Sequence, residues 1–348
     1  MRRFSYDRLK DEKWDSEIIG YLTVIHEARG KQSVYMKQKP QELDKLVEIA
    51  KVQSTEASNE IEGIRTTNTR LRQLMEEKTS PRTRDEKEIA GYRDALNIIH
   101  ESFDYIPLTP NYIRQLHRIL LSHTDSAFGG NFKSVQNYIS ATDESGKSYT
   151  LFTPPAPFET PGMVEELCNE YNRVIGEGKV DPLIVIPIFI HDFLCIHPFI
   201  DGNGRMSRLL TTLLLYRSGY EVGNFISLEA KIAKHKDLYY DALYASQQGW
   251  HEGKDDPTPF IKYLLGTIAA AYRDFEERME IVTEKGTSLN AVRRAIETRI
   301  GKFTKAEIAG LCPNLSSTTV ERLLKTLCDA GEIEKKGSGR ATFYVRLT

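Results

Sequence analysis

The sequence has few cysteines and no long uninterrupted hydrophobic segment. Its 348 residues include only 4 cysteines and no Cys-x-x-Cys pair, which argues against a disulfide framework and a zinc site. The most apolar stretch, residues 182–200, is interrupted by Pro187, His191, Asp192 and His197, so it predicts a buried helix rather than a membrane span. The N-terminus lacks the apolar core of a signal peptide. We therefore expect a cytoplasmic protein with no membrane partner.

The chain also lacks a strong excess of charge, an internal repeat and a low-complexity tract. A formal net charge of −2 and a hydrophobic content of 40% fit a globular protein of two or three domains. The patterns predict an N-terminal helical region over residues 1–100, a core over residues 101–283 and a small domain over residues 288–348. Residues 284–288 are typical of a linker. The expected fold class is mainly α.

One short run, residues 197–208, combines a histidine, a carboxylate, a glycine-flanked turn and two arginines. Gly202 and Gly204 remove the side chains that would keep a phosphate from the backbone. The helical pattern that follows places them at a helix N-terminus, where the dipole favours anions. A turn that merely links two helices is the alternative, but it would need none of the other residues at these spacings. The run therefore predicts a site that binds phosphate groups.

Two residues of this run indicate the chemistry of the site. A carboxylate beside an anion site repels the anion unless a divalent metal bridges the two, so Asp201 indicates Mg²⁺ together with a nucleotide. His197 precedes the turn and is the natural general base for a hydroxyl that attacks a bound phosphorus. Cys195 lies two residues away and points to another helix face, so we interpret it as a core residue. His191 is interpreted as a structural histidine.

The run His-Pro-Phe-Ile-Asp-Gly-Asn-Gly-Arg-Met-Ser-Arg resembles the signature of the Fic family at every defined position. The resemblance implies a helical Fic core that transfers AMP from ATP to a Ser, Thr or Tyr hydroxyl of a target protein or of the chain itself. Related Doc kinases carry lysine where this chain has Gly204, so Gly204 favours AMP transfer. The family roles would fall on His197 as base, Asp201 as Mg²⁺ ligand, Gly202, Asn203 and Gly204 as the anion hole for the α- and β-phosphates, Arg205 on the phosphates and Arg208 on the γ-phosphate.

A second segment, residues 58–63, ends a helical pattern that begins near residue 42. Glu62 stands in the last helical turn, where a carboxylate opposes the helix dipole, so either solvent or a cation must compensate it. The segment resembles the Fic inhibitory motif, in which the glutamate pairs with the second signature arginine. By that resemblance Glu62 would pair with Arg208 and obstruct the γ-phosphate, Ser58 would support the contact, and Gly63 would end the helix. The resemblance also leaves open that the same site removes AMP, with Glu62 positioning water.

Two further segments complete the expected site. Residues 132–153 alternate in polarity around a turn, which predicts a β-hairpin, and in Fic proteins a flap at this position holds the target segment. An ordinary surface hairpin is the alternative. Residues 236–243 predict an amphipathic helix with aromatic residues that are more often core than ligand contacts. The family resemblance nevertheless makes Tyr240 and Gln247 candidate contacts for the adenine base.

Residues 288–348 predict a winged helix-turn-helix domain. Residues 304–309 and 316–324 begin two short helices, and residues 333–336 and 341–347 flank a turn at residues 337–340. Lysines and arginines there suggest nucleic acid, but Glu321 on the second helix and the slightly acidic chain do not favour it. Such modules also bind proteins or form homodimers. The main hypothesis is thus an autoinhibited AMP transferase, and the alternative is a DNA-binding regulator whose Fic core senses a nucleotide.

Overall fold

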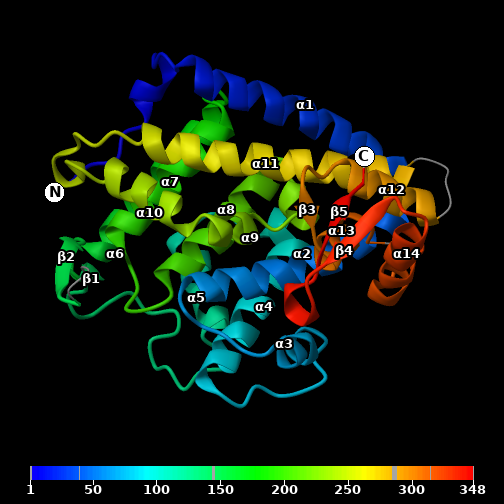
Figure 1. Cartoon of the computed structure of the whole chain (residues 1–348). Helices are drawn as coiled ribbons and strands as arrows, with labels where there is room; N and C mark the ends of the chain where they lie inside the picture. Colours follow the sequence, from blue (N-terminus) through cyan, green and yellow to red (C-terminus); the bar gives the residue numbers. More distant parts are fainter. Residues whose placement is uncertain (1, 39, 143–145, 284–287, 314, 348) are drawn as a thin grey trace.

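Two buried helices, α7 (Pro182–Ile196) and α8 (Asn203–Arg217), pack against each other at the centre of the structure (Figure 1). The structure is a computed structural model that describes residues 2–38, 40–142, 146–283, 288–313 and 315–347. Helix α7 begins where the Asp181 side chain accepts a hydrogen bond from the Leu183 amide, with Pro182 in the first turn. It ends at His197, whose backbone is left-handed. The loop between the two helices therefore sits at the ends of two core elements.

The other helices surround this pair. Helices α6 (Thr160–Glu177) and α11 (Thr258–Thr283) pack on α7, and α4 (Arg84–Ser102) and α5 (Pro110–Leu120) pack on α8. Helix α1 (Ser16–Gln38) runs along α11 in Figure 1. The remaining helices of this part are α2 (Pro40–Ile61), α3 (Asn68–Met75), α9 (Leu228–Lys234) and α10 (Lys236–Ser246), with short 3₁₀ helices at Asp7–Lys10, Phe103–Tyr105, Val222–Asn224 and Trp250–Glu252. The mainly helical fold with a hairpin is confirmed.

The hairpin is shorter than the sequence predicts. Strands β1 (Ile139–Thr142) and β2 (Ser148–Phe152) pair antiparallel, with Ala141 opposite Tyr149. Residues 132–138 form no strand, because this segment hydrogen-bonds to the loop between α7 and α8. The predicted turn includes residues 143–145, which lie outside the described residues.

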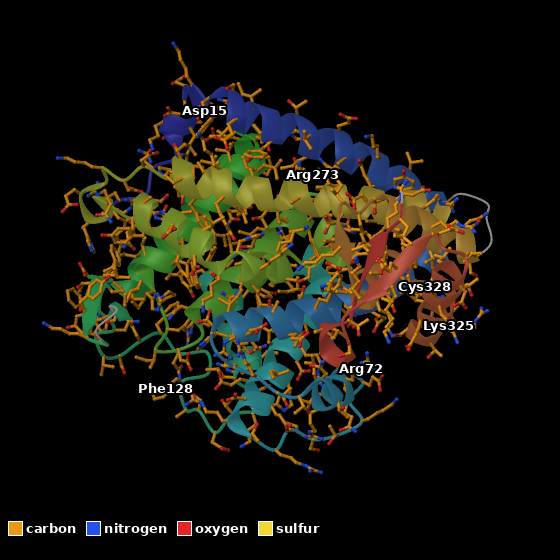
Figure 2. All side chains as sticks on the ribbon, viewed as in Figure 1. Asp15, Arg72, Phe128, Arg273, Lys325 and Cys328 are labelled. Atoms are coloured by element: carbon orange, nitrogen blue, oxygen red, sulfur yellow. The ribbon has the colours of Figure 1, made fainter. Side chains whose placement is uncertain are left out.

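The C-terminal part has its own hydrophobic cluster, which includes Val292, Phe303 and Leu324. Its helices are α12 (Ser288–Glu297), α13 (Lys305–Leu311) and α14 (Ser317–Asp329), and its strands are β3 (Lys302–Phe303), β4 (Ile333–Lys336) and β5 (Phe343–Arg346), with a 3₁₀ turn at Gly339–Ala341. The strands form an antiparallel sheet in the order β3-β5-β4. Figure 2 shows Lys325 and Cys328 on α14, across the view from Phe128 on the loop before the hairpin. The predicted helices and the strands at both sides of the turn are present, whereas the expected linker residues 284–287 lie outside the described residues.

The N-terminal segment enters the core beside α7. The Arg2 guanidinium bonds to Asp255 and to Asp192, the latter at 3.0 Å, and the Tyr6 hydroxyl donates to Asp192 at 2.8 Å. The segment thereby fixes α7 to the loop before α11. Among the described residues, no helix combines the length and the apolar composition that crossing a membrane requires.

Candidate active site

A cavity of about 510 Å³ opens where the loop between α7 and α8 meets the hairpin, α10 and the end of α2. The signature residues 197–208 supply one wall, and Ser140 and Leu151 of the hairpin supply another. Tyr240 and Gln247 line the end formed by α10, and Glu62 reaches in from the turn after α2. The structure therefore brings four segments that are far apart in the sequence to one cavity.

His197 is half-buried in the wall of this cavity, and its backbone conformation is strained. Its φ of +49° is unusual for a residue with a side chain. Its Nδ1 lies 3.2 Å from the Leu194 carbonyl oxygen, which can only accept, so Nδ1 carries the proton and Nε2 keeps a lone pair. Burial is the largest cause that lowers the pKa of His197 to about 4, because it disfavours the charged imidazolium. The imidazole is therefore neutral at physiological pH and ready to accept a proton through Nε2.

The first turn of α8 leaves space for an anion. Gly202 is the N-cap in a left-handed conformation, with φ of +82°. A Cβ on Gly204 would lie 2.2 Å from Glu62 Oε1, so the glycine leaves the space that the Glu62 carboxylate takes beside the backbone. The first amide groups of a helix have no partner within the helix, and they attract anions. In the structure, the Glu62 carboxylate lies next to this turn at Gly204.

The side chain of Asn203 hydrogen-bonds to the backbone of the loop between α7 and α8. Its Oδ1 accepts from the Phe199 amide at 2.9 Å, and its Nδ2 donates to the Phe199 carbonyl at 2.8 Å. The two bonds fix the turn that presents the amides of α8. Any contact of Asn203 with a phosphate therefore falls to its backbone.

Asp201 offers a carboxylate that is half exposed at the edge of the cavity. Its Oδ1 accepts from the Gly202 amide at 2.6 Å, and Oδ2 lies 3.8 Å from a guanidinium nitrogen of Arg84. The side chain keeps 51% of its surface exposed. One carboxylate with a solvent-accessible oxygen beside a phosphate site is a usual donor set for Mg²⁺, which binds through one or two carboxylates, waters and substrate phosphates. The residues present thus fit a magnesium ion.

The two signature arginines have different partners. Arg205 is buried, and its NH1 lies 2.8 Å from Glu88 of α4, while its NH2 lies 3.7 Å from Asp201. Arg208 is also buried, and its NH2 lies 2.8 Å from Glu62 Oε1. The Ser58 hydroxyl accepts from Arg208 Nε at 2.8 Å, and the Ser58 carbonyl accepts from its NH2 at 2.9 Å. The cation that compensates Glu62 is therefore Arg208.

The turn that carries Glu62 is shaped by its backbone. Helix α2 ends at Ile61, and Gly63 is left-handed with φ of +80°. The amide of Ile64 donates to the Asn59 carbonyl, which closes the helix end. Ser58 and Gly63 thus act on the site through Arg208 and through the turn, and Glu62 itself lines the cavity.

Several residues of the site were missed by the sequence reasoning. His117 of α5 stacks on Phe199 with ring centroids 3.7 Å apart, and its Nε2 donates to the Asp201 carbonyl at 2.9 Å, because its Nδ1 accepts from the Gly130 amide. Burial lowers the pKa of His117 to about 4. No sequence pattern around Glu88 marked it as a partner of Arg205. Tyr244 also lines the cavity, and its spacing of four from Tyr240 on the same helix was the signal for it.

Two interpretations from the sequence can be compared with the cavity directly. Cys195 is buried, as expected for a core residue, and its Sγ lies 3.7 Å from His191 Nε2. His191 is buried as well, so its interpretation as a structural residue agrees with its position. Both residues nevertheless contribute to the cavity wall.

Residues 107–215 match the family model described as "Fic/DOC family". The chain is similar to "Protein adenylyltransferase Fic" of Drosophila yakuba, with 30% identity over 185 residues that cover 52% of this chain and 32% of that protein. The protein of the same name from Aedes aegypti is 28% identical over 187 residues, with the same coverage. A solved Fic family protein from Desulfovibrio desulfuricans G20 superposes with a TM-score of 0.61 at 20% identity, covering 96% of this chain and 97% of that one.

The matched residues include the loop between α7 and α8 that lines the cavity. The chain is a Fic domain protein. The chain covers about a third of the length of the Aedes and Drosophila relatives.

Proposed function

We propose that this chain is a protein adenylyltransferase that transfers AMP from ATP to a hydroxyl group of a target protein or of itself, and that Glu62 inhibits it. The curated relatives named protein adenylyltransferase support the reaction class. The observation that carries the proposal is the position of Glu62: its carboxylate lies against Gly204 and pairs with Arg208. We further propose that residues 1–100, 101–283 and 288–348 are the N-terminal, catalytic and C-terminal parts.

In the proposed transfer each group of the site has a role. A target hydroxyl gives its proton to Nε2 of His197 while its oxygen forms a bond to the α-phosphorus of ATP. The bond from the α-phosphorus to the bridging oxygen of pyrophosphate breaks, and pyrophosphate leaves. The amides of the first turn of α8 and the guanidinium of Arg205 stabilise the charge on the phosphates. Mg²⁺ held by Asp201 would neutralise phosphate charge in the same site.

The other parts of the cavity bind the rest of the reactants. Tyr240 and Gln247 of the α10 wall are the proposed contacts of the adenine base, with Tyr244 beside them. Strand β1 contributes Ser140 to the cavity and is the proposed docking strand for a segment of the target. Such docking would bring a hydroxyl of that segment to His197.

Inhibition follows from charge and space. Arg208 is the proposed partner of the γ-phosphate, yet in the structure its guanidinium is bound to Glu62 and Ser58. The Glu62 carboxylate also repels a triphosphate that approaches the turn at Gly204. ATP therefore cannot take its productive position until Glu62 moves. Removal of AMP by the same site, with Glu62 positioning water, is an extension of this proposal.

The alternative, a nucleic-acid-binding regulator, stays a prediction from the sequence. Lys305 pairs with Glu321 at 2.7 Å, and Arg293 pairs with Glu332 at 2.6 Å. Carboxylates of the same part balance both of these cations, which disfavours their contact with the phosphates of a duplex. The test of the proposed function is label transfer from the α-phosphate of ATP to protein, with and without Glu62.

The charge state of His197 predicts how transfer depends on pH. A general base works in its neutral form, so a pKa of about 4 keeps it active in mildly acidic solution. We expect kcat/KM of a Glu62→Gly variant at pH 5.5 to stay within about twofold of its value at pH 7, because this parameter reports the free enzyme. A histidine with the ordinary pKa of about 6.5 would lose roughly eightfold over this range. A loss of that size would contradict the burial of His197.

Lys236 holds the backbone next to Glu62, so its substitution should also weaken the inhibition. Its Nζ donates to the Ile61 carbonyl at 2.5 Å, one residue before Glu62, and lies 5.5 Å from the centre of the Tyr240 ring. Lys236→Met removes this bond and should raise transfer about fivefold over wild type, which corresponds to roughly 1 kcal/mol for one hydrogen bond. Lys234→Met is the matched control. Lys234 is exposed, and it lines the same surface pocket beside α2 as Lys236. Equal rates for wild type and Lys236→Met would show that this bond does not restrain Glu62.

A further inference from the structure

The segment just before the hairpin contacts the loop that carries His197. Lys133 donates to this segment twice: its Nζ bonds to the Ile196 carbonyl at 3.0 Å, and its backbone amide bonds to the Pro198 carbonyl at 2.8 Å. The Asn137 side-chain amide donates to the carbonyls of His197 and Phe199, each at 3.0 Å. Lys133 Nζ also donates to Asn137 Oδ1 at 2.9 Å, so the two side chains hold each other. Four consecutive carbonyls, from residue 196 to residue 199, thus receive donors from these two residues.

These bonds meet a specific need of the loop. His197 is one of two residues other than glycine with positive φ among those the structure describes, and such a conformation costs about 1–2 kcal/mol. The last carbonyls of α7 also have no partner within the helix. Donors from outside the loop are therefore required to keep it in one conformation. Lys133 and Asn137 supply them from one short segment.

Lys133 also acts on His197 through its charge. The Lys133 side chain is buried, with 3% of the residue exposed, and burial lowers its pKa to about 8, so it remains mainly protonated at neutral pH. Its charge contributes to lowering the pKa of His197, after burial as the largest cause. Glu62, Asp201 and the hydrogen bond to Leu194 raise the pKa of His197. Glu159 raises the pKa of Lys133. The lysine thus opposes the protonation that the two carboxylates favour.

We propose that Lys133 and Asn137 form a positioning clamp that holds the His197 loop in its strained conformation and links it to the hairpin. The link is short, because Asn137 lies two residues before β1. A target segment that pairs with β1 would therefore act on the clamp and through it on the base. This inference rests on the proposed role of His197 in transfer.

The test separates the charge of the clamp from its geometry. Lys133→Met, Lys133→Arg and Asn137→Ala are made in the full chain, and the pKa of His197 is measured by NMR titration of ¹⁵N-labelled imidazole. Lys133→Met should raise the pKa of His197 toward its ordinary value, because a nearby positive charge is lost. Lys133→Arg should stay near the wild-type value. Asn137→Ala should leave the pKa unchanged, because no charge is removed.

Label transfer provides the second measurement, in a Glu62→Gly background. Lys133→Met and Asn137→Ala should each lower kcat about tenfold or more with little change in KM for ATP, because a displacement of about 1 Å at a reacting group can cost a hundredfold. Lys133→Arg should restore most of the rate. Lys325→Met is the control with an equal loss of charge, because Lys325 is exposed on α14.

Two outcomes would overturn the clamp. The first is an unchanged His197 pKa in Lys133→Met, and the second is an unchanged kcat in Asn137→Ala. If the parent Glu62→Gly protein transfers no label, the proposed function fails, while the NMR titration still decides whether Lys133 sets the charge of His197. Circular dichroism spectra that match those of the parent protein show that each variant is folded. If Lys133→Met does not fold, Lys133→Arg still allows the test.

Discussion

Glu62→Gly should raise the transfer of α-phosphate label from ATP to protein by at least tenfold over wild type. The substitution removes the carboxylate that lies against Gly204 and frees Arg208 for the γ-phosphate. A hydrogen bond to a charged group contributes about 1.5–3 kcal/mol, which corresponds to roughly ten- to hundredfold in an equilibrium. The measurement is incorporation of label into the chain itself and into proteins of a cell lysate at fixed ATP and Mg²⁺.

The matched control for this prediction is Glu60→Gly. Glu60 belongs to the same helix end, but its carboxylate pairs with Arg65 at 2.9 Å, away from Arg208. The control removes the same charge and adds the same backbone freedom without opening the site. If Glu60→Gly activates as strongly as Glu62→Gly, the effect comes from loosening α2 and the obstruction by Glu62 is rejected.

His197→Asn, added to Glu62→Gly, should lower transfer by about 10²–10⁴, the usual contribution of a general base. Asparagine is the appropriate replacement because it tolerates the left-handed conformation that residue 197 adopts. An amide cannot accept the hydroxyl proton, so the loss falls on the chemical step. The measurement is the single-turnover rate at saturating ATP.

Binding of ATP distinguishes a lost base from a damaged site. The double variant should bind ATP with the affinity of Glu62→Gly, because the first turn of α8, Arg205 and Arg208 are unchanged. Single-turnover transfer that persists within about threefold of the parent would mean that another group takes the proton. His117 is not that group, because both of its ring nitrogens are occupied by backbone partners.

Local patterns in the sequence were sufficient for much of this site. The run at residues 197–208 predicted the anion turn, the base and the carboxylate, because all of them lie within twelve consecutive residues. Glu62 was recognisable through a motif, and the structure places it 2.8 Å from Arg208. Tyr240 and Gln247 also line the cavity, and their contact with an adenine base stays a prediction.

The missed features depend on contacts between distant segments. Glu88 pairs with Arg205 across 117 positions, and no pattern around Glu88 marks it. Residues 132–138 alternate like a strand, but Lys133 and Asn137 bind the His197 loop instead of a neighbouring strand. Strand β3 has only two residues and exists because it pairs with β5. In each case contacts with distant segments, rather than local propensity, determine the conformation or the pairing.

The central claim is that Glu62 occupies the nucleotide site of an AMP transferase. It is tested most directly by offering ATP labelled either at the α- or at the γ-phosphate to wild type and to Glu62→Gly, with Mg²⁺, and measuring label on protein. The account predicts strong α-label with Glu62→Gly, weak α-label with wild type and no γ-label with either. Transfer of γ-label, or equal α-label from the two proteins, would contradict it.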